Sequence, residues 1–206
     1  MSLSSELRGR LTTLVESDPV VLFMKGTRDA PQCGFSATTV EILDRLLAEY
    51  TTVDVLSDPD LREGVKEFSD WPTIPQLYVR GEFVGGSDIV REMHVKGELH
   101  DALGLSRPDP IVPEIEVTEN AADALRGALE RSPDGALHLV IDARFQCRVG
   151  VGPHEGGELV VESGGMTFLL DAETAGRADG IKIDIVDTPG GQALSVHNPN
   201  APATGG

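Results

Sequence analysis

A proline-rich segment in the middle of the chain constrains the fold more than any other feature. Residues 107–113 hold three prolines in seven positions. Proline lacks a backbone N–H and fixes φ, so such a run is typical of a semi-rigid linker rather than of a helix or strand. In a chain of 206 residues, it predicts two small domains, over residues 1–106 and 114–206.

The first domain alternates helices and strands. Val20–Met24 is an apolar run between Pro19 and Gly26, which is typical of a strand buried on both faces. Period and turn signals predict helices over residues 4–16, 36–49 and 59–69, strands over 51–55, 76–79 and 83–84, a helix capped by Ser87 or Asp88, and a last helix over 99–103. This order indicates βαβ organisation and an α/β fold.

The pattern changes after the linker. Residues 114–117 alternate like a half-buried strand, and Thr118 is expected to cap a helix that runs to about Arg131. Strand-like runs then follow between glycine-rich turns, over residues 137–141, 144–149, 159–161, 167–170, 181–186 and 193–196. The second domain is therefore expected to be mostly β.

Charge and cysteine content exclude several classes of function. The net charge of −17 repels nucleic acid and anionic membrane surfaces. We find neither a basic segment followed by a long apolar run nor about 18 consecutive apolar residues, so a cytoplasmic protein without membrane contact is expected. The two cysteines, Cys33 and Cys147, exclude a disulfide framework and a four-thiolate site within one chain. Any metal cluster must borrow ligands.

Cys33 is the main candidate for chemistry. It lies just ahead of a predicted helix, where unpaired N–H groups and the positive end of the helix dipole favour the thiolate. The alternative is that a lone cysteine is only a small buried hydrophobic residue.

Three other segments provide context for Cys33. Lys25 ends the apolar strand, from where its ammonium can reach a thiolate or a carboxylate. In Trp71-Pro72-Thr73-Ile74-Pro75, a proline before a strand favours a cis peptide and exposes the Ile74 backbone to an extended peptide ligand. Gly85-Gly86-Ser87-Asp88 leads into a helix N-terminus that could bind a carboxylate, with Asp88 available for an amine. The plainer alternatives are a solvated lysine, a rigid turn and an ordinary N-cap.

Taken together, residues 4–104 resemble the monothiol glutaredoxins. The resemblance rests on Lys25-Gly26-Thr27, Cys33-Gly34-Phe35-Ser36, Trp71-Pro72-Thr73-Ile74-Pro75-Gln76 and Gly85-Gly86-Ser87-Asp88. It implies a thioredoxin-like fold, with a mixed four-stranded sheet flanked by helices and with Pro75 in cis.

The resemblance also implies a ligand set. Glutathione would lie along Thr73 and Ile74, with its glycine carboxylate near Lys25 and Arg62 and its γ-glutamyl end at Ser87 and Asp88. Cys33 would be the metal ligand and the catalytic residue, and two chains with two glutathiones would share one two-iron two-sulfur (2Fe-2S) cluster. The full set of residues expected to bind this cofactor is Lys25, Cys33, Phe35, Arg62, Thr73, Ile74, Pro75, Gly86, Ser87 and Asp88.

Two departures from familiar patterns qualify the chemistry. Dithiol exchange uses Cys-x-x-Cys, and here Ser36 stands in place of the second thiol, so an ordinary disulfide reductase is excluded. Many monothiol glutaredoxins carry cysteine where this chain has Ser87, a position outside the expected ligand set. A weak deglutathionylase, resolved by free glutathione, remains the alternative activity.

Residues 113–204 resemble A-type iron–sulfur carriers (HesB-like proteins), through Ile115–Ala122 and His197–Ala201. The paired cysteines of that family are absent, because the chain ends Pro202-Ala203-Thr204-Gly205-Gly206. Cys147 lies near the family's middle cysteine but is offset, and we interpret it as structural. A degenerate carrier domain is expected to recognise a partner or to dimerise rather than to hold metal.

The sequence thus predicts a glutathione-dependent protein that binds and transfers a 2Fe-2S cluster in iron–sulfur assembly or iron homeostasis. Its expected partners are glutathione, a second copy when the cluster is bound, and iron–sulfur assembly or acceptor proteins. Two alternatives stay open: an oxidoreductase that acts on protein–glutathione mixed disulfides through Cys33, and an interaction scaffold.

Overall fold

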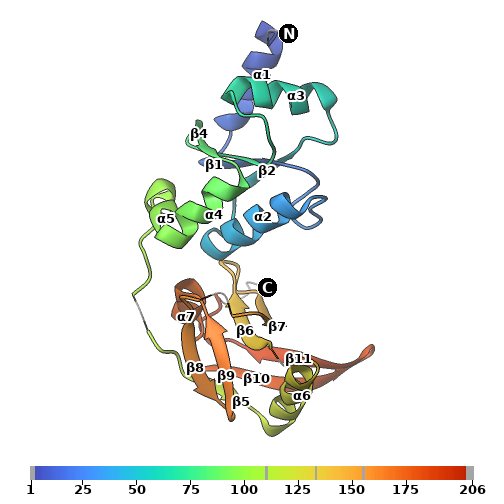
Figure 1. Cartoon of the computed structure of the whole chain (residues 1–206), viewed down its shortest axis with the longest axis vertical. Coiled ribbons are helices and arrows are strands. Elements are labelled where there is room, and N and C mark those ends of the chain that lie inside the picture. The colour runs from blue at the N-terminus through green and yellow to red at the C-terminus, as the bar shows by residue number, and fades with distance from the viewer. Residues whose placement is uncertain (1–2, 110, 133, 155, 203–206) are drawn as a thin grey trace. The chain divides into compact units, whose positions relative to one another are not determined.

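The computed structural model describes residues 3–109, 111–132, 134–154 and 156–202. The chain divides into two compact units, residues 1–107 and 108–206, which are described one at a time (Figure 1). Pro110 of the proline-rich segment and tail residues 203–206 lie outside the described residues. Within the described ranges, no helix has the length and apolar character needed to cross a membrane.

The first unit is built on a mixed sheet with the strand order β2-β1-β3-β4. Its strands are β1 (Val20–Met24), β2 (Thr51–Asp54), β3 (Gln76–Val79) and β4 (Glu82–Gly85). β1 pairs in parallel with β2 and antiparallel with β3, and β3 continues into β4 as a hairpin. The parallel pair needs a crossover connection, which contains α2 (Gly34–Leu46).

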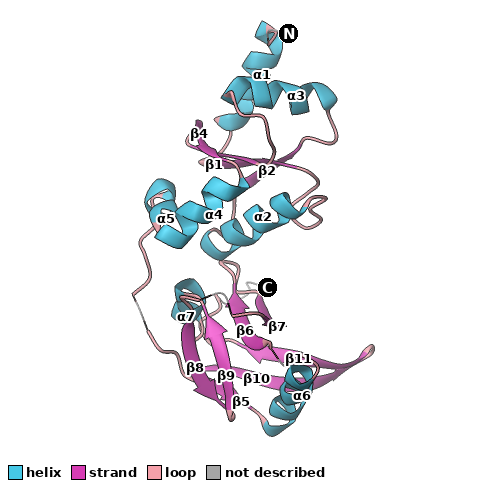
Figure 2. Ribbon diagram, viewed as in Figure 1, coloured by secondary structure: helices cyan, strands magenta, loops and turns pink. Residues whose placement is uncertain are grey.

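Helices cover both faces of this sheet (Figures 1 and 2). α1 (Ser5–Val15) and α3 (Pro59–Ser69) pack on one face, and α2, α4 (Ser87–Lys96) and α5 (Glu98–Leu103) on the other. The side chains of β1 alternate between the two cores: Val21 and Phe23 face α1 and α3, whereas Leu22 and Met24 face α2 and α4. All four are fully buried. The thioredoxin-like arrangement expected for this half is confirmed.

The start of α4 differs from the prediction. Gly86 occupies the N-cap position without a side-chain hydrogen bond, so neither Ser87 nor Asp88 caps the helix. The reason is that β4 ends at Gly85, which leaves one residue before the helix begins. Ser87 is already helical, and its hydroxyl instead donates to the carbonyl of Phe35 at 3.2 Å.

The second unit contains two sheets that share one hydrophobic core. One sheet has the order β11-β10-β5 and the other the order β7-β6-β9-β8. Leu137, Leu139, Phe168, Ile181 and Ile183 are fully buried in the shared core. The elements are β5 (Ile115–Val117), α6 (Glu119–Glu130), β6 (Ala136–Ile141), β7 (Cys147–Gly152), β8 (Leu159–Ser163), β9 (Met166–Leu170), α7 (Ala172–Arg177), β10 (Ile181–Thr188) and β11 (Gly191–His197).

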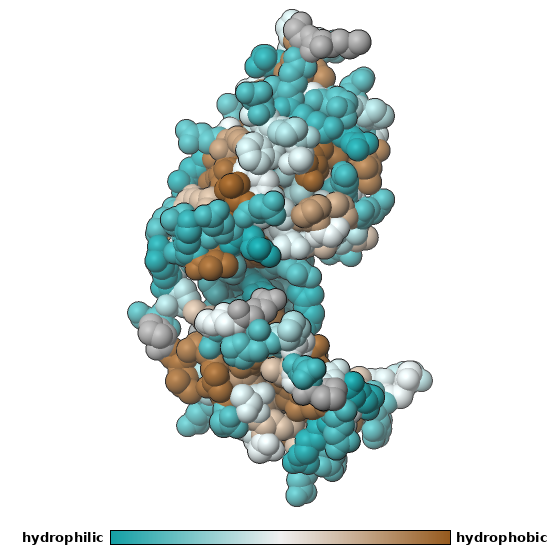
Figure 3. Space-filling model, viewed as in Figure 1, coloured by the Kyte–Doolittle hydropathy of each residue, from teal (hydrophilic) through white to brown (hydrophobic). Residues whose placement is uncertain are grey.

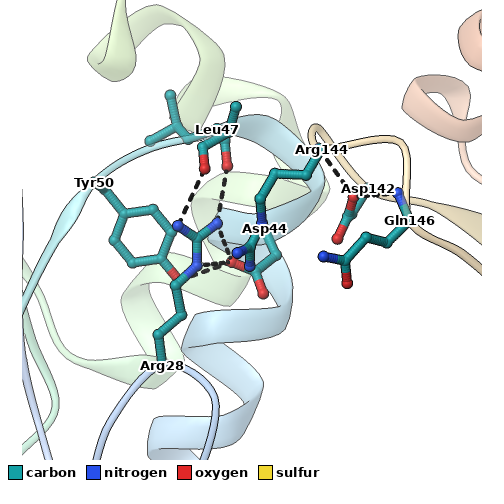
Figure 4. A network of polar contacts seen from close by, with 8 residues as sticks. Arg28, Asp44, Leu47, Tyr50, Asp142, Arg144 and Gln146 are labelled. Atoms are coloured by element: carbon teal, nitrogen blue, oxygen red, sulfur yellow. Dashed lines mark hydrogen bonds and ion pairs between the residues drawn. The ribbon is translucent and has the colours of Figure 1, made fainter. Parts of the chain in front are cut away.

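Two details of the second unit correct the sequence reading. The strand expected from residue 144 begins only at Cys147, because Asp142 turns the chain. Its carboxylate accepts the N–H groups of Arg144 and Gln146 at 2.9 and 2.8 Å, and Phe145 adopts φ 60° (Figure 4). Helix α7 was not predicted, since six residues with little apolar content are too few to show a helical period.

Surface polarity differs within the second unit. Figure 3 shows apolar side chains gathered over β8 and β9 on the visible face of this unit. Val160 contributes to the exposed apolar surface on β8, with 55% of its area accessible. β8 is an edge strand, so this apolar surface lies beside unpaired backbone groups.

Tyr78 gives a test of the first unit's core. It is 1% exposed, contacts the rings of Phe23, Phe68 and Phe83, and donates its hydroxyl to Gln76 Oε1 at 3.1 Å. Burial raises the pKa of Tyr78 from 10.0 to about 12. The phenol therefore loses its proton more easily in the unfolded chain, and the stability that this provides below pH 10 is lost as the pH rises toward 12.

We expect alkaline unfolding to reflect this shift. Between pH 10 and 12, the free energy of unfolding should fall by about 1–2 kcal/mol more in the native chain than in Tyr78→Phe, measured by urea denaturation. Equal pH dependence in the two proteins would contradict the assignment.

Candidate functional site

Cys33 is the N-cap residue of α2. Its backbone is extended, with φ −155° and ψ 136°, and its carbonyl accepts the N–H of Ala37 at 2.9 Å as the first bond of the helix. No side chain caps this end of α2, so the first N–H groups remain directed toward the region of the thiol. Cys33 is half-buried, and Phe35 beside it is 60% exposed.

Ser36 has a structural role in this turn. Its hydroxyl is fully buried and accepts the backbone N–H of Lys25 at 3.2 Å. The contact joins the end of β1 to the first turn of α2 and thereby places Lys25 beside Cys33. The position that carries a second thiol in dithiol proteins is thus used here to hold the loop.

The segment from Trp71 to Gln76 forms the opposite wall of the site. The Ile74–Pro75 peptide bond is cis, as the family resemblance implied. The buried amide of Gln76 donates to the carbonyls of Trp71 and Thr73 at 3.0 and 3.1 Å. Sequence reasoning did not assign Gln76 a role, although its place directly after the Ile-Pro pair made it a candidate.

The N-terminus of α4 forms the third wall. Gly86 is buried, and a Cβ at this position would stand 3.1 Å from Trp71 Nε1, which is tighter than ordinary contact. Glycine is therefore needed here for the close approach of α4 to Trp71. Through the hydroxyl of Ser87, the same helix end also bonds the carbonyl of Phe35.

These walls enclose a cavity of about 460 Å³. All ten residues that the sequence predicted for the site line it, and the structure adds Lys66, Trp71, Pro72 and Ile89. Lys66 could have been found from sequence, because it follows Arg62 by one helical turn on α3. With Lys25, Arg62 and Lys66 against Asp88, the cavity favours a ligand that carries more negative than positive charge.

Arg62 is held between protein and cavity. Its Nε atom is buried and makes no hydrogen bond within the described ranges. Lys66 lies on the same helix and pairs with Glu63 at 2.9 Å, which places the lysine at the cavity edge.

The metal-binding capacity of one chain is limited. Among the described residues, no group of three or more histidine, cysteine, aspartate or glutamate side chains could hold a metal ion. Cys33 alone therefore cannot complete a metal centre, and any such centre needs ligands from outside the chain.

Cys147 lies in a different environment, in the second unit. It is half-buried at the start of β7, and its Sγ lies 3.8 Å from the carbonyl of Phe145. Burial raises the pKa of the Cys147 thiol, and the nearby Asp142 carboxylate adds to this effect, while a hydrogen bond with Asn198 opposes it. The structural interpretation of Cys147 remains a prediction.

The comparisons with known proteins concern about half of the chain. The glutaredoxin family model matches residues 20–84. The mitochondrial monothiol glutaredoxin-5 of Schizosaccharomyces pombe is 56% identical over 108 residues, which are 49% of this chain and 71% of that protein. An uncharacterized ycf64-like monothiol glutaredoxin of Synechocystis is 52% identical over 101 residues, which are 49% of this chain and 94% of that protein.

Among solved structures, the solution structure of reduced poplar apo GrxS14 shares 51% sequence identity with this chain. It matches 50% of this chain and 95% of its own length, with a TM-score of 0.46.

We expect the two thiols to differ in reactivity. Because burial raises its pKa, Cys147 should react with iodoacetamide at pH 7 about tenfold more slowly than free cysteine for each unit of the increase. Cys33, at an uncapped helix N-terminus, should be modified first. Peptide mass spectrometry after timed quenching measures both rates in one sample, and faster labelling of Cys147 would contradict the expectation.

Proposed function

Because this chain belongs to the monothiol glutaredoxin family, we propose that its first unit binds glutathione beside Cys33 and carries a 2Fe-2S cluster between two copies of the protein. The cluster is the cargo, to be passed on in iron–sulfur protein assembly or iron homeostasis. The observation that carries this proposal is the convergence of one thiol, three cations and one carboxylate on a single cavity.

The cavity suits glutathione in size and charge. Its volume of about 460 Å³ lies within the usual range for small-ligand sites. Glutathione has two carboxylates and one ammonium group, which match Lys25 and Arg62 at one end and Asp88 at the other. The backbone at Thr73 and Ile74 lies between these ends, where it can pair with an extended peptide.

The shortage of thiolates supports a shared cluster. One chain offers Cys33, and Ser36 is engaged with the backbone of Lys25. A bound glutathione supplies a second thiolate at the same place, so two chains with two glutathiones provide four sulfur ligands. The residues of this chain hold the tripeptide, orient its thiol toward Cys33 and keep Cys33 at the end of α2.

For the second unit, we propose a role in recognising a cluster donor or acceptor. Its resemblance to A-type carriers lacks that family's paired cysteines, so the proposed role rests on protein contact. The alternative for the whole chain is deglutathionylation, in which the Cys33 thiolate takes glutathione from a mixed disulfide, releases the protein thiol and is itself released by a second glutathione as glutathione disulfide.

Cluster reconstitution tests the main proposal. Incubated without oxygen with iron, sulfide and glutathione, the native chain should become coloured and should elute from gel filtration as a dimer. Cys33→Ser, or omission of glutathione, should abolish both changes, whereas Cys147→Ser should keep them.

A colourless monomer under the full conditions would overturn the cluster proposal. If the same sample instead shows rapid, Cys33-dependent turnover of a glutathionylated protein with glutathione in excess, the oxidoreductase alternative is the correct function.

Glutathione affinity tests the cavity separately. Arg62→Ala removes a charged partner of a carboxylate and should weaken binding about tenfold or more, measured by titration calorimetry. Arg91→Ala, on the exposed surface of α4 and outside the cavity lining, is the matched control and should bind like the native chain. Equal affinity in both variants would exclude the expected carboxylate site.

A further inference from the structure

Arg28 makes the densest set of polar contacts in the loop before Cys33, although it does not line the cavity (Figure 4). Its Nε and Nη2 atoms both lie 2.7 Å from Asp44 Oδ1, and each of the two side chains is only 12% exposed. Nη1 donates to the carbonyl of Ala48 at 3.1 Å, and Nη2 donates to that of Leu47 at 3.3 Å. The guanidinium thus caps the C-terminal end of α2.

Tyr50 completes this cluster. The Arg28 guanidinium lies 4.1 Å from the centre of the Tyr50 ring, and the Tyr50 hydroxyl donates to Asp44 Oδ1 at 2.9 Å. A half-buried ion pair with these additional hydrogen bonds and ring contacts is fixed in geometry, unlike an exposed pair.

The loop that carries Arg28 is itself closed. Gly26 has φ 84°, and a Cβ there would stand within 2.4 Å of the carbonyl oxygen of Ala30. At its base, Gln32 N–H donates to the carbonyl of Lys25 at 2.9 Å, and Gly26 N–H donates to Asp54 Oδ1 at 2.9 Å. A movement at Arg28 is therefore passed to the base of the loop, where Cys33 begins.

Cys33 lies between the two segments that Arg28 joins. The chain runs from Arg28 through the closed loop to Cys33, then along α2 to Asp44, and the ion pair closes this ring. Both neighbours of Cys33, the loop before it and the helix after it, are therefore held by one side chain.

We propose that Arg28 is a positioning residue for Cys33. It holds the loop and α2 in the arrangement that keeps the Cys33 sulfur at the helix N-terminus, where the thiolate is favoured. The inference rests on Cys33 being the reactive thiol of the proposed function, but it does not need glutathione or a cluster to be bound.

The test is the pH–rate profile of Cys33 alkylation by iodoacetamide, without glutathione, read by peptide mass spectrometry. In Arg28→Met, the rate at pH 7 should fall about 2- to 5-fold, the size of a helix-terminus effect, and the midpoint of the profile should move to higher pH. The matched control is Arg10→Met, which removes an ion pair with Asp58 at 2.6 Å on α1 and should leave the profile unchanged.

Stability is measured in parallel by thermal unfolding. A lower melting temperature with an unchanged or faster Cys33 profile would show that Arg28 is only structural, and would overturn the proposal. Should Arg28→Met fail to fold, Arg28→Lys decides, because it keeps the charge but cannot reach all three acceptors at once. Its profile must move in the same direction, and an unchanged profile overturns the proposal.

Discussion

The burial of β1 on both faces is the constraint on which the first unit depends. Val21 and Phe23 form one core with α1 and α3, and Leu22 and Met24 form the other with α2 and α4. Because the strand cannot shift without exposing one of these sets, its C-terminal end is fixed in space. Lys25 follows directly, and the chain then turns through the Arg28 loop into Cys33.

The site is assembled from three separate pieces of sequence around that fixed end. The uncapped N-terminus of α2 presents Cys33, the cis Ile74–Pro75 segment is shaped by the buried amide of Gln76, and the close approach at Gly86 brings in Ser87 and Asp88. Each piece alone has an ordinary structural explanation. Their convergence on one cavity, with an excess of positive charge, distinguishes a ligand site from three unrelated turns.

The shortage of thiols gives the proposed function its particular form. Ser36 uses its hydroxyl to hold Lys25, so Cys33 has no resolving partner in the adjacent turn. A single thiol of this kind needs an external thiol for either of the chemistries considered, whether it ligates a shared cluster or exchanges glutathione. In both cases the cavity acts first as a tripeptide site. The second unit, with its two sheets and one half-buried cysteine, adds no thiol to that site in the chemistry proposed here.

The sequence by itself determined the helices and strands of the first unit, because a buried strand and amphipathic helices have clear periods, and its motifs named all ten cavity residues that were expected. It missed the helix over Ala172–Arg177 and extended the strand before Cys147 too far, since short elements and side-chain turns such as that at Asp142 leave little periodic signal. Only the tertiary structure decided that Gly86 rather than Ser87 caps α4, that Lys66 reaches the cavity, and that Arg28 pairs with Asp44. These depend on packing between segments distant in sequence, and local residue patterns do not record such distances.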